Sequence, residues 1–176
     1  MKTSLLTQAL AQQLLQRGWQ LATAESCTGG MIAAACTDVA GSSLWFERGF
    51  VSYSNASKHD MLGVPMALID QHGAVSEQVA QAMVLGALQR SQAQVAIAVT
   101  GIAGPGGGSK HKPVGTVCFA WALPADSGPS VGAESAWVKV STCHFNGDRA
   151  EVRTATLAHA LSQLLDLMHH RQSSPI

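Results

Sequence analysis

Hydrophobic residues near the start of the chain recur with a helical period. Leu6, Leu10 and Leu14 lie four residues apart, which is the spacing of the buried face of an amphipathic helix. They predict a helix over residues 4–17. Gly18 follows this segment and is expected to end the helix.

Shorter apolar runs along the rest of the chain predict strands. The run over residues 94–100 is a near-continuous series of Val, Ala and Ile, which is typical of a central strand covered on both faces. The last two runs are separated by residues 124–134, a loop rich in Pro, Gly and Ser. The predicted strands cover residues 19–24, 47–54, 94–100, 115–123 and 135–145.

Capping residues mark the start of several helices. Ser76 is expected to cap a helix that continues to about Arg90, and Asn55 is expected to cap a short helix. Asp148 and Glu151 have the spacing of a capping box at the start of the last helix. The predicted internal helices cover residues 30–37, 56–62 and 76–90.

The order of these elements predicts the fold. Helices alternate with strands in the first part of the chain and two adjacent strands follow, which is typical of an α/β protein. We expect a three-layer α/β/α sandwich with a mixed sheet of about five strands. We also expect a single domain over residues 1–170, without a repeat or linker, and a frayed tail over residues 171–176.

Composition and charge narrow the possible partners. The 176 residues carry eleven Lys plus Arg and eleven Asp plus Glu, so the excess positive charge of nucleic-acid-binding proteins is missing. No apolar window approaches the roughly 18 residues of a membrane span, and Thr7 and Gln8 interrupt the signal-like start. We therefore expect neither a nucleic-acid nor a membrane partner.

The cysteines and histidines argue against disulfides and metals. The four cysteines form no C-x-x-C pair, and the chain is long enough to build a core without disulfides. We therefore expect reduced thiols and a cytoplasmic protein. The seven histidines show no H-x-x-x-H or H-x-H spacing, so no metal site is predicted.

Ser26 is the first candidate for chemistry. It lies in the segment AESCTGG, residues 24–30, where a predicted strand gives way to a helix. A hydroxyl there would lie beside unpaired backbone amides and the positive end of a helix dipole, which suits a nucleophile. The alternative is an ordinary glycine turn. The neighbouring Cys27 is interpreted as a small packed side chain.

Tyr53 and Lys58 form the second candidate. The lysine follows the tyrosine by five residues, so it can fold back over the end of the strand. It lies between apolar stretches, and burial would lower its pKa from about 10.4 toward the roughly 7 to 8 of a useful base. The alternative is structural, with a solvated lysine on a short helix and a tyrosine at the rim of the fold.

A glycine-rich segment is the third candidate. Residues 100–109, TGIAGPGGGS, directly follow the predicted central strand. Ligands bind beyond the carboxyl ends of strands in open α/β sheets, and glycine lets the backbone approach them closely. The segment matches neither a Walker A loop nor G-x-G-x-x-G, so a nucleoside triphosphate is not predicted. It is either a ligand-binding loop or only a mobile one.

Together these segments resemble one known family. Ser26 and its neighbours, Tyr53-Ser54-Asn55 with Lys58, and residues 100–109 are similar to motifs of the CinA carboxy-terminal family. Further matching segments extend the resemblance over nearly the whole chain, to about residue 170. These segments are GSSLWF (41–46), HGAVS (72–76), KPVGTV (112–117) and GDR (147–149).

The resemblance implies an activity and a set of catalytic residues. The implied enzyme is a nicotinamide-nucleotide amidase, which hydrolyses nicotinamide mononucleotide to nicotinate mononucleotide and ammonia. The implied catalytic group contains no metal and no cofactor, and it falls on Ser26, Tyr53 and Lys58. The resemblance also implies a fold like the anticodon-binding-domain sandwiches and a homo-oligomer.

A mechanism follows as a hypothesis. Neutral Lys58 takes the Ser26 proton, directly or through Tyr53, and Ser26 attacks the carboxamide carbon. Backbone amides of residues 28–30 hold the developing oxyanion. The phosphate lies against the glycine-rich segment or near Arg149. The expected substrate-binding residues are Thr28, Gly29, Gly30, Asn55, Thr100, Gly101, Gly104 and Arg149.

Two other functional classes are alternatives. A nucleotide-binding or regulatory module of the same fold would hold its ligand without changing it, but the intact set of Ser26, Tyr53 and Lys58 favours the enzyme. A phosphotransferase would need a magnesium-binding carboxylate and a P-loop lysine. Neither is apparent in the sequence.

Overall fold

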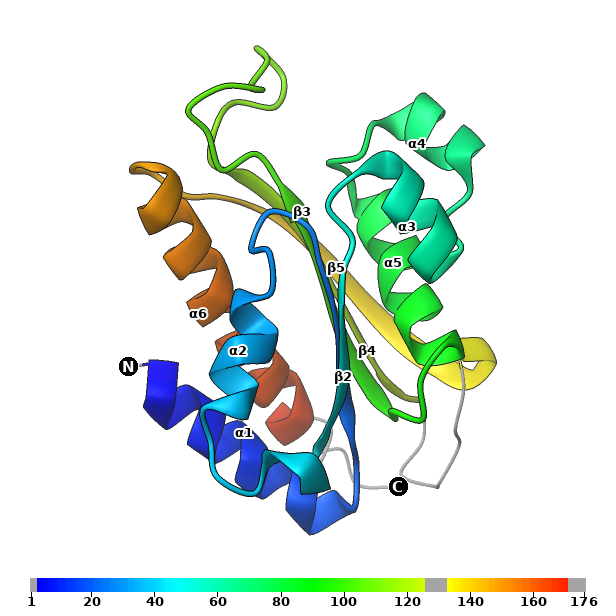
Figure 1. Cartoon of the computed structure of the whole chain (residues 1–176), viewed down its shortest axis with the longest axis vertical. Helices are drawn as coiled ribbons and strands as arrows, with labels where there is room; N and C mark the ends of the chain where they lie inside the picture. Colours follow the sequence, from blue (N-terminus) through cyan, green and yellow to red (C-terminus); the bar gives the residue numbers. More distant parts are fainter. Residues whose placement is uncertain (1–2, 126–132, 171–176) are drawn as a thin grey trace.

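A five-stranded mixed sheet forms the centre of the protein (Figure 1). The computed structural model describes residues 3–125 and 133–170. The strand order is β2-β1-β3-β4-β5; β1 is parallel to β2 and β3, whereas β4 is antiparallel to both β3 and β5. The strands are β1 (Leu21–Glu25), β2 (Phe46–Val51), β3 (Val95–Gly101), β4 (Thr116–Pro124) and β5 (Ala136–His144).

Helices cover both faces of the sheet. The helices α1 (Thr3–Arg17), α2 (Met31–Thr37) and α6 (Arg149–His170) lie on one face (Figure 1). The helices α3 (Asn55–Leu62), α4 (Met66–His72) and α5 (Glu77–Gln89) lie on the other. Short 3₁₀ turns occur at Ser42–Leu44 and Ala133–Ser135. The predicted three-layer α/β/α sandwich is therefore confirmed.

The two faces of the sheet carry side chains of different size. Because side chains alternate along a strand, each face collects every second residue. The face under α1, α2 and α6 carries the large residues Leu21, Val95, Ile97, Val99, Val117, Phe119, Trp121 and Leu123. The face under α5 carries Ala22, Ala24, Ala96, Ala98, Cys118, Ala120 and Ala122.

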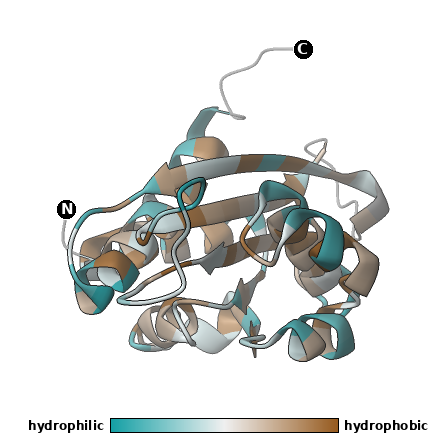
Figure 2. Ribbon diagram, turned by 90° about the horizontal axis from the view of Figure 1, so that it is seen from above, coloured by the Kyte–Doolittle hydropathy of each residue, from teal (hydrophilic) through white to brown (hydrophobic). Residues whose placement is uncertain are grey.

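Helix α5 supplies the volume that the alanine face lacks. Val79, Met83 and Val84 are fully buried against that face. At Gly86 an added Cβ would overlap the backbone oxygen of Leu62, so α5 and the end of α3 approach closely. Apolar positions face the interior of the sandwich and polar ones gather on its outer surfaces (Figure 2).

Two predicted caps are confirmed and one is wrong. The Ser76 hydroxyl accepts the N–H of Val79 at the start of α5. Asp148 accepts the backbone N–H groups of residues 150 and 151, and the Glu151 carboxylate accepts the N–H of Asp148. The N-cap of α3 is Ser54, one residue before the predicted Asn55, because its hydroxyl forms a capping box with Ser57.

The sequence did not indicate α4. This helix has only seven residues, its N-cap is Pro65 without a side-chain hydrogen bond, and Ile69 is its one buried residue. So short a helix shows no full hydrophobic period. The predicted tail 171–176 and residues 126–132 of the predicted loop lie outside the described residues. None of the described helices is both long and apolar enough to span a bilayer.

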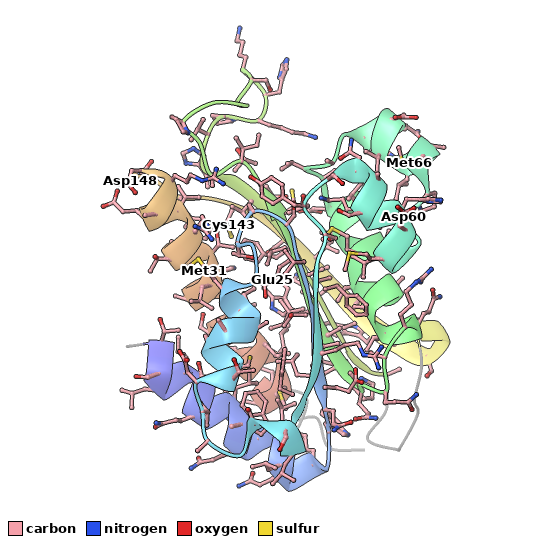
Figure 3. The ribbon with its side chains drawn as sticks, in the orientation of Figure 1. Glu25, Met31, Asp60, Met66, Cys143 and Asp148 are labelled. Atoms are coloured by element: carbon pink, nitrogen blue, oxygen red, sulfur yellow. The ribbon has the colours of Figure 1, made fainter. Side chains whose placement is uncertain are left out.

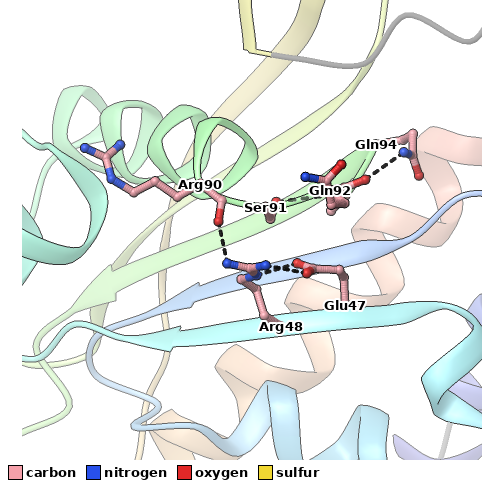
Figure 4. A network of polar contacts seen from close by, with 7 residues as sticks. Glu47, Arg48, Arg90, Ser91, Gln92 and Gln94 are labelled. Atoms are coloured by element: carbon pink, nitrogen blue, oxygen red, sulfur yellow. Dashed lines mark hydrogen bonds and ion pairs between the residues drawn. The ribbon is translucent and has the colours of Figure 1, made fainter.

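A polar network connects the edge strand β2 to the end of α5 (Figure 4). The Arg48 guanidinium donates to the backbone oxygen of Arg90 at 2.7 Å and pairs with Glu47 at 2.6 Å. An ion pair at the surface adds little to stability, because water screens its charges. The position of β2 therefore depends mainly on its backbone pairing with β1.

Candidate active site

Ser26 lies at the carboxyl end of the central part of the sheet. It follows the last residue of β1, and its N–H donates to the backbone oxygen of Val99 at 3.0 Å, which continues the β1–β3 ladder by one residue. The residue is buried, with 8% of its surface exposed, and it lines a cavity. The hydroxyl is therefore held by the sheet at the position where ligands of α/β proteins bind.

Lys58 brings its amine to that hydroxyl. The side chain extends from α3 and is almost completely buried, with 1% exposed. Its Nζ lies 3.0 Å from Ser26 Oγ, 2.8 Å from the Ser52 backbone oxygen and 3.3 Å from the Tyr53 backbone oxygen. Burial lowers the pKa of Lys58, and the neighbouring Cys27 opposes this shift only in part.

A charged ammonium can donate to all three of these oxygens, and a neutral amine can also satisfy the three contacts. A neutral amine has two N–H bonds and one lone pair. The carbonyls of Ser52 and Tyr53 can accept the two N–H groups, because carbonyl oxygens only accept. The lone pair is then directed at the Ser26 hydroxyl, which is the one contact of the three that can donate a proton. This arrangement suits a base acting on a serine.

Tyr53 takes a different place in the site. Its ring lines the same cavity but is 61% exposed, and its hydroxyl accepts a hydrogen bond from the Arg149 guanidinium at 3.0 Å. Arg149 also donates to the backbone oxygen of Gly104 at 2.9 Å. Among the described residues, the tyrosine hydroxyl forms no hydrogen bond with Ser26 or Lys58. The lysine contacts Tyr53 only through its backbone.

Glu25 is a residue of this site that the sequence analysis missed. Its carboxylate is fully buried between the sheet and the first turn of α2 (Figure 3), where it accepts the N–H groups of Gly30, Ile32 and Ala33 at 3.1, 3.0 and 2.8 Å. A negative group at a helix start is favoured by the helix dipole. The sequence did contain a signal for this role, because Glu25 is an acidic residue shortly before a glycine pair and a predicted helix.

These contacts limit which backbone amides can hold an oxyanion. Of the three expected donors, the Gly29 N–H is bonded to the Ser26 backbone oxygen and the Gly30 N–H to Glu25. The N–H groups of Cys27 and Thr28 donate to no backbone oxygen in the described part of the chain, and both are directed toward the Cys27 thiol. Two of the three amides expected to hold the oxyanion are therefore already bonded within the protein.

The other predicted binding residues divide into two groups. Thr100 and Gly101 line the cavity, and a Cβ at Gly101 would lie only 3.1 Å from Cys27 Sγ, so glycine lets the two segments pack together. Gly104 contacts Arg149 through its carbonyl. Asn55 lies exposed in the first turn of α3 and is not among the residues that line the cavity.

Two neighbouring cavities meet at the site. The first, of about 200 Å³, is lined by Ser26, Lys58 and Tyr53 together with Ala103 and Arg149. The second, of about 480 Å³, shares Ala103 and Arg149 with it. It is also lined by Arg153, which the sequence analysis missed and whose guanidinium donates to the Thr28 backbone oxygen at 2.7 Å.

Cys27 is confirmed as a packed side chain. It is 5% exposed, and burial raises the pKa of its thiol to about 11. The protonated thiol is a poor nucleophile. All four cysteines are free. Within residues 3–125 and 133–170, no group of three or more His, Cys, Asp and Glu residues lies together as a metal site would require.

Comparisons with known proteins agree on one family. Nicotinamide-nucleotide amidohydrolase PncC of Pseudomonas putida is 50% identical over 165 residues, 94% of this chain and 96% of that protein. A CinA-like protein of Chlorobium luteolum is 53% identical over 150 residues, 85% of this chain and 33% of that protein. The chain thus spans nearly all of some curated relatives and about a third of others.

The fold agrees with a solved structure. The crystal structure of the competence/damage inducible protein CihA from Agrobacterium tumefaciens is 43% identical to the chain, with a TM-score of 0.86. The match covers 95% of this chain and 96% of that one. The family model described as the CinA C-terminal domain matches residues 3–168. The chain therefore belongs to the CinA C-terminal domain family.

Proposed function

We propose that the protein hydrolyses the carboxamide of nicotinamide mononucleotide to give nicotinate mononucleotide and ammonia. Relatives that it matches over nine tenths or more of both chains are named nicotinamide-nucleotide amidohydrolase. The observation that carries the proposal is the 3.0 Å contact between Ser26 Oγ and the buried amine of Lys58. An activated serine of this kind can attack an unstrained amide.

Acylation begins with proton transfer. Lys58 accepts the Ser26 proton directly, because its amine contacts the hydroxyl and the Tyr53 hydroxyl is bonded to Arg149. Ser26 Oγ attacks the carboxamide carbon, and the N–H groups of Cys27 and Thr28 stabilise the oxyanion. The protonated Lys58 then gives its proton to the departing nitrogen. Ammonia leaves, and an acyl ester remains on Ser26.

Deacylation reverses the role of the lysine. Neutral Lys58 takes a proton from water as the water attacks the ester carbon. Collapse of the second tetrahedral species breaks the bond to Ser26 Oγ, and Lys58 returns the proton to the serine. Nicotinate mononucleotide leaves, and the site is restored.

Substrate binding uses the two adjoining cavities. The pyridine ring enters the smaller cavity, where the apolar side chains of Ala74 and Val75 form part of the wall. The phosphate lies in the larger one near the guanidinium groups of Arg149 and Arg153, which suit phosphate oxygens. Tyr53 covers the entrance and takes no part in proton transfer. Thr100 and Gly101 contact the ring side of the substrate. Asn55 does not line the cavity and is not expected to contact the substrate.

A non-catalytic nucleotide-binding module of the same fold is the alternative. The burial of Lys58 favours the enzyme, because a lysine that only bound a phosphate would stay charged and exposed. A homo-oligomer, implied by family resemblance, stays a prediction that light scattering of the purified protein tests.

Ser26→Ala distinguishes the two functions. We expect ammonia release from nicotinamide mononucleotide to fall by about 10³-fold or more, because the nucleophile is lost. The matched control is Ser43→Ala, since Ser43 is exposed in the 3₁₀ turn after α2. Release that survives Ser26→Ala contradicts the mechanism. An unaltered protein that binds the nucleotide and releases no ammonia is the alternative module.

A further inference from the structure

Residues 72–75 run from the last residue of α4 to the residue before Ser76, the N-cap of α5. Their backbone carbonyls are all hydrogen-bonded, and every donor is a side chain. Lys112 Nζ donates to the oxygens of His72 at 2.8 Å and Val75 at 2.7 Å. The Ser76 hydroxyl donates to Gly73 at 2.9 Å, and the Thr100 hydroxyl donates to Ala74 at 2.8 Å.

This segment is a wall of the catalytic cavity. Ala74 and Val75 line the cavity together with Ser26 and Lys58. Two of the three anchoring residues are local or belong to the cavity itself: Ser76 directly follows the segment, and Thr100 also lines the cavity. Lys112 is the anchor that comes from outside.

Lys112 joins two segments that are distant in the sequence. It lies 40 residues from His72 and 37 from Val75, at the end of the glycine-rich stretch that connects β3 to β4. Gly73 is placed beside it with a φ of +78°, and a Cβ added there would lie 3.5 Å from Lys112 Nζ. Gly73 thus gives the segment a backbone conformation that other residues rarely adopt, and Lys112 bonds the carbonyls at both ends of the segment.

We infer that Lys112 is a positioning residue for amide hydrolysis. Its ammonium holds Ala74 and Val75 where they bear on the pyridine ring, so the carboxamide carbon stands opposite Ser26. Hydrogen bonds from a charged donor are roughly twice as strong as neutral ones, and two of them act on one short segment. The inference rests on the proposed amidase function.

The kinetic test compares Lys112→Met with Lys112→Arg. We expect the methionine variant to lose about 10- to 100-fold in kcat/KM, largely through KM, because a displaced wall misplaces the ring. The arginine variant keeps charged donors and should recover to within roughly threefold of the unaltered protein. The acid limb of the pH profile should not move, because Lys58 is untouched.

Lys110→Met is the matched control. Lys110 is an exposed lysine two residues away in the same stretch, and its loss should leave KM within about twofold of the unaltered value. Kinetic constants for Lys112→Met equal to those of the control overturn the inference. So does a methionine variant whose acid limb moves, because Lys112 would then act on the base.

Hydrogen exchange separates this inference from the proposed function. In the absence of any substrate, Lys112→Met should exchange the amides of residues 73–76 faster than the unaltered protein, and Lys112→Arg should not. Unchanged exchange in the methionine variant overturns the anchoring role, whatever the activity. An unaltered protein that releases no ammonia defeats the amidase function, while exchange still decides whether Lys112 holds the wall.

Discussion

Two hydrogen bonds of equal length lie at the carboxyl end of the sheet and differ in their chemical role. Lys58 Nζ lies 3.0 Å from Ser26 Oγ, and an Arg149 nitrogen lies 3.0 Å from the Tyr53 hydroxyl. The first contact is buried, whereas Tyr53 is 61% exposed. The pKa of Lys58 is lowered by burial, so its amine can be neutral and basic. Burial, more than distance, decides which contact can move a proton.

The exposed contact between Arg149 and Tyr53 can be exchanged easily for a contact with a ligand. Water competes for both of its partners, so its net contribution to stability is small. The Arg149 guanidinium can therefore exchange the tyrosine hydroxyl for a phosphate oxygen at little cost. In our proposal the buried pair performs the chemistry, and the exposed pair admits and holds the nucleotide.

Removing the buried amine should have the largest effect. We expect Lys58→Met to lower kcat by about 10³-fold or more, because no other group takes the Ser26 proton. In the unaltered protein, activity needs the neutral amine, so the rate should fall as pH decreases through a pKa below that of an exposed lysine. Ammonia release measured between pH 5 and 10 gives both the loss of kcat in the variant and the pH dependence of the unaltered protein.

Lys110→Met serves as the control for charge, because Lys110 is exposed. A Lys58→Met protein that retains more than about a tenth of the activity would assign the base elsewhere. An acid limb at the pKa of an ordinary carboxylate would do the same.

Changes to the exposed pair should have intermediate effects. We expect Arg149→Met to raise KM about 10- to 100-fold with little change in kcat, because it removes a contact made equally in the ground and transition states. Tyr53→Phe should change either constant by less than about threefold. Steady-state kinetics with nicotinamide mononucleotide measure both. A larger loss of kcat for Tyr53→Phe than for Arg149→Met would place the phenol in proton transfer.

Stability should change least, and in the opposite direction to activity. Burial lowers the pKa of Lys58 in the folded protein, so near neutral pH the unfolded chain binds the proton more readily. The cost to stability is greatest at low pH and disappears as pH rises toward the pKa of an exposed lysine. Lys58→Met should therefore raise the melting temperature by a few degrees at pH 7 and less at pH 9.5. Thermal unfolding at the two pH values tests this, and a destabilised variant contradicts it.

Short-range signals predicted much of the fold. The caps at Ser76 and Asp148 and the central strand could be predicted because each depends on residues that are close in the sequence. The cap of α3 was placed one residue late, since Ser54 and Asn55 are both good caps and only the bond to Ser57 decides between them. Helix α4 was missed because seven residues are too few to show a period.

The candidate site was predicted in part. Residue type and position nominated Ser26 and Lys58, and the structure brings their side chains together across 32 residues of sequence. The roles of Glu25 and Arg153 could not be read in the same way. The contacts of Glu25 depend on the conformation of the turn between β1 and α2. Arg153 contacts Thr28 across 125 residues of sequence.

The sequence alone determined most of the elements, their order and the residue types available for catalysis, because periodicity and capping act within a few residues. Only the tertiary structure decided which groups meet. It buried Lys58 against Ser26, bonded the Tyr53 hydroxyl to Arg149, 96 residues away, and occupied two of the expected oxyanion donors. Those outcomes depend on how helices pack across the sheet and on which groups lose water, and no local pattern encodes either.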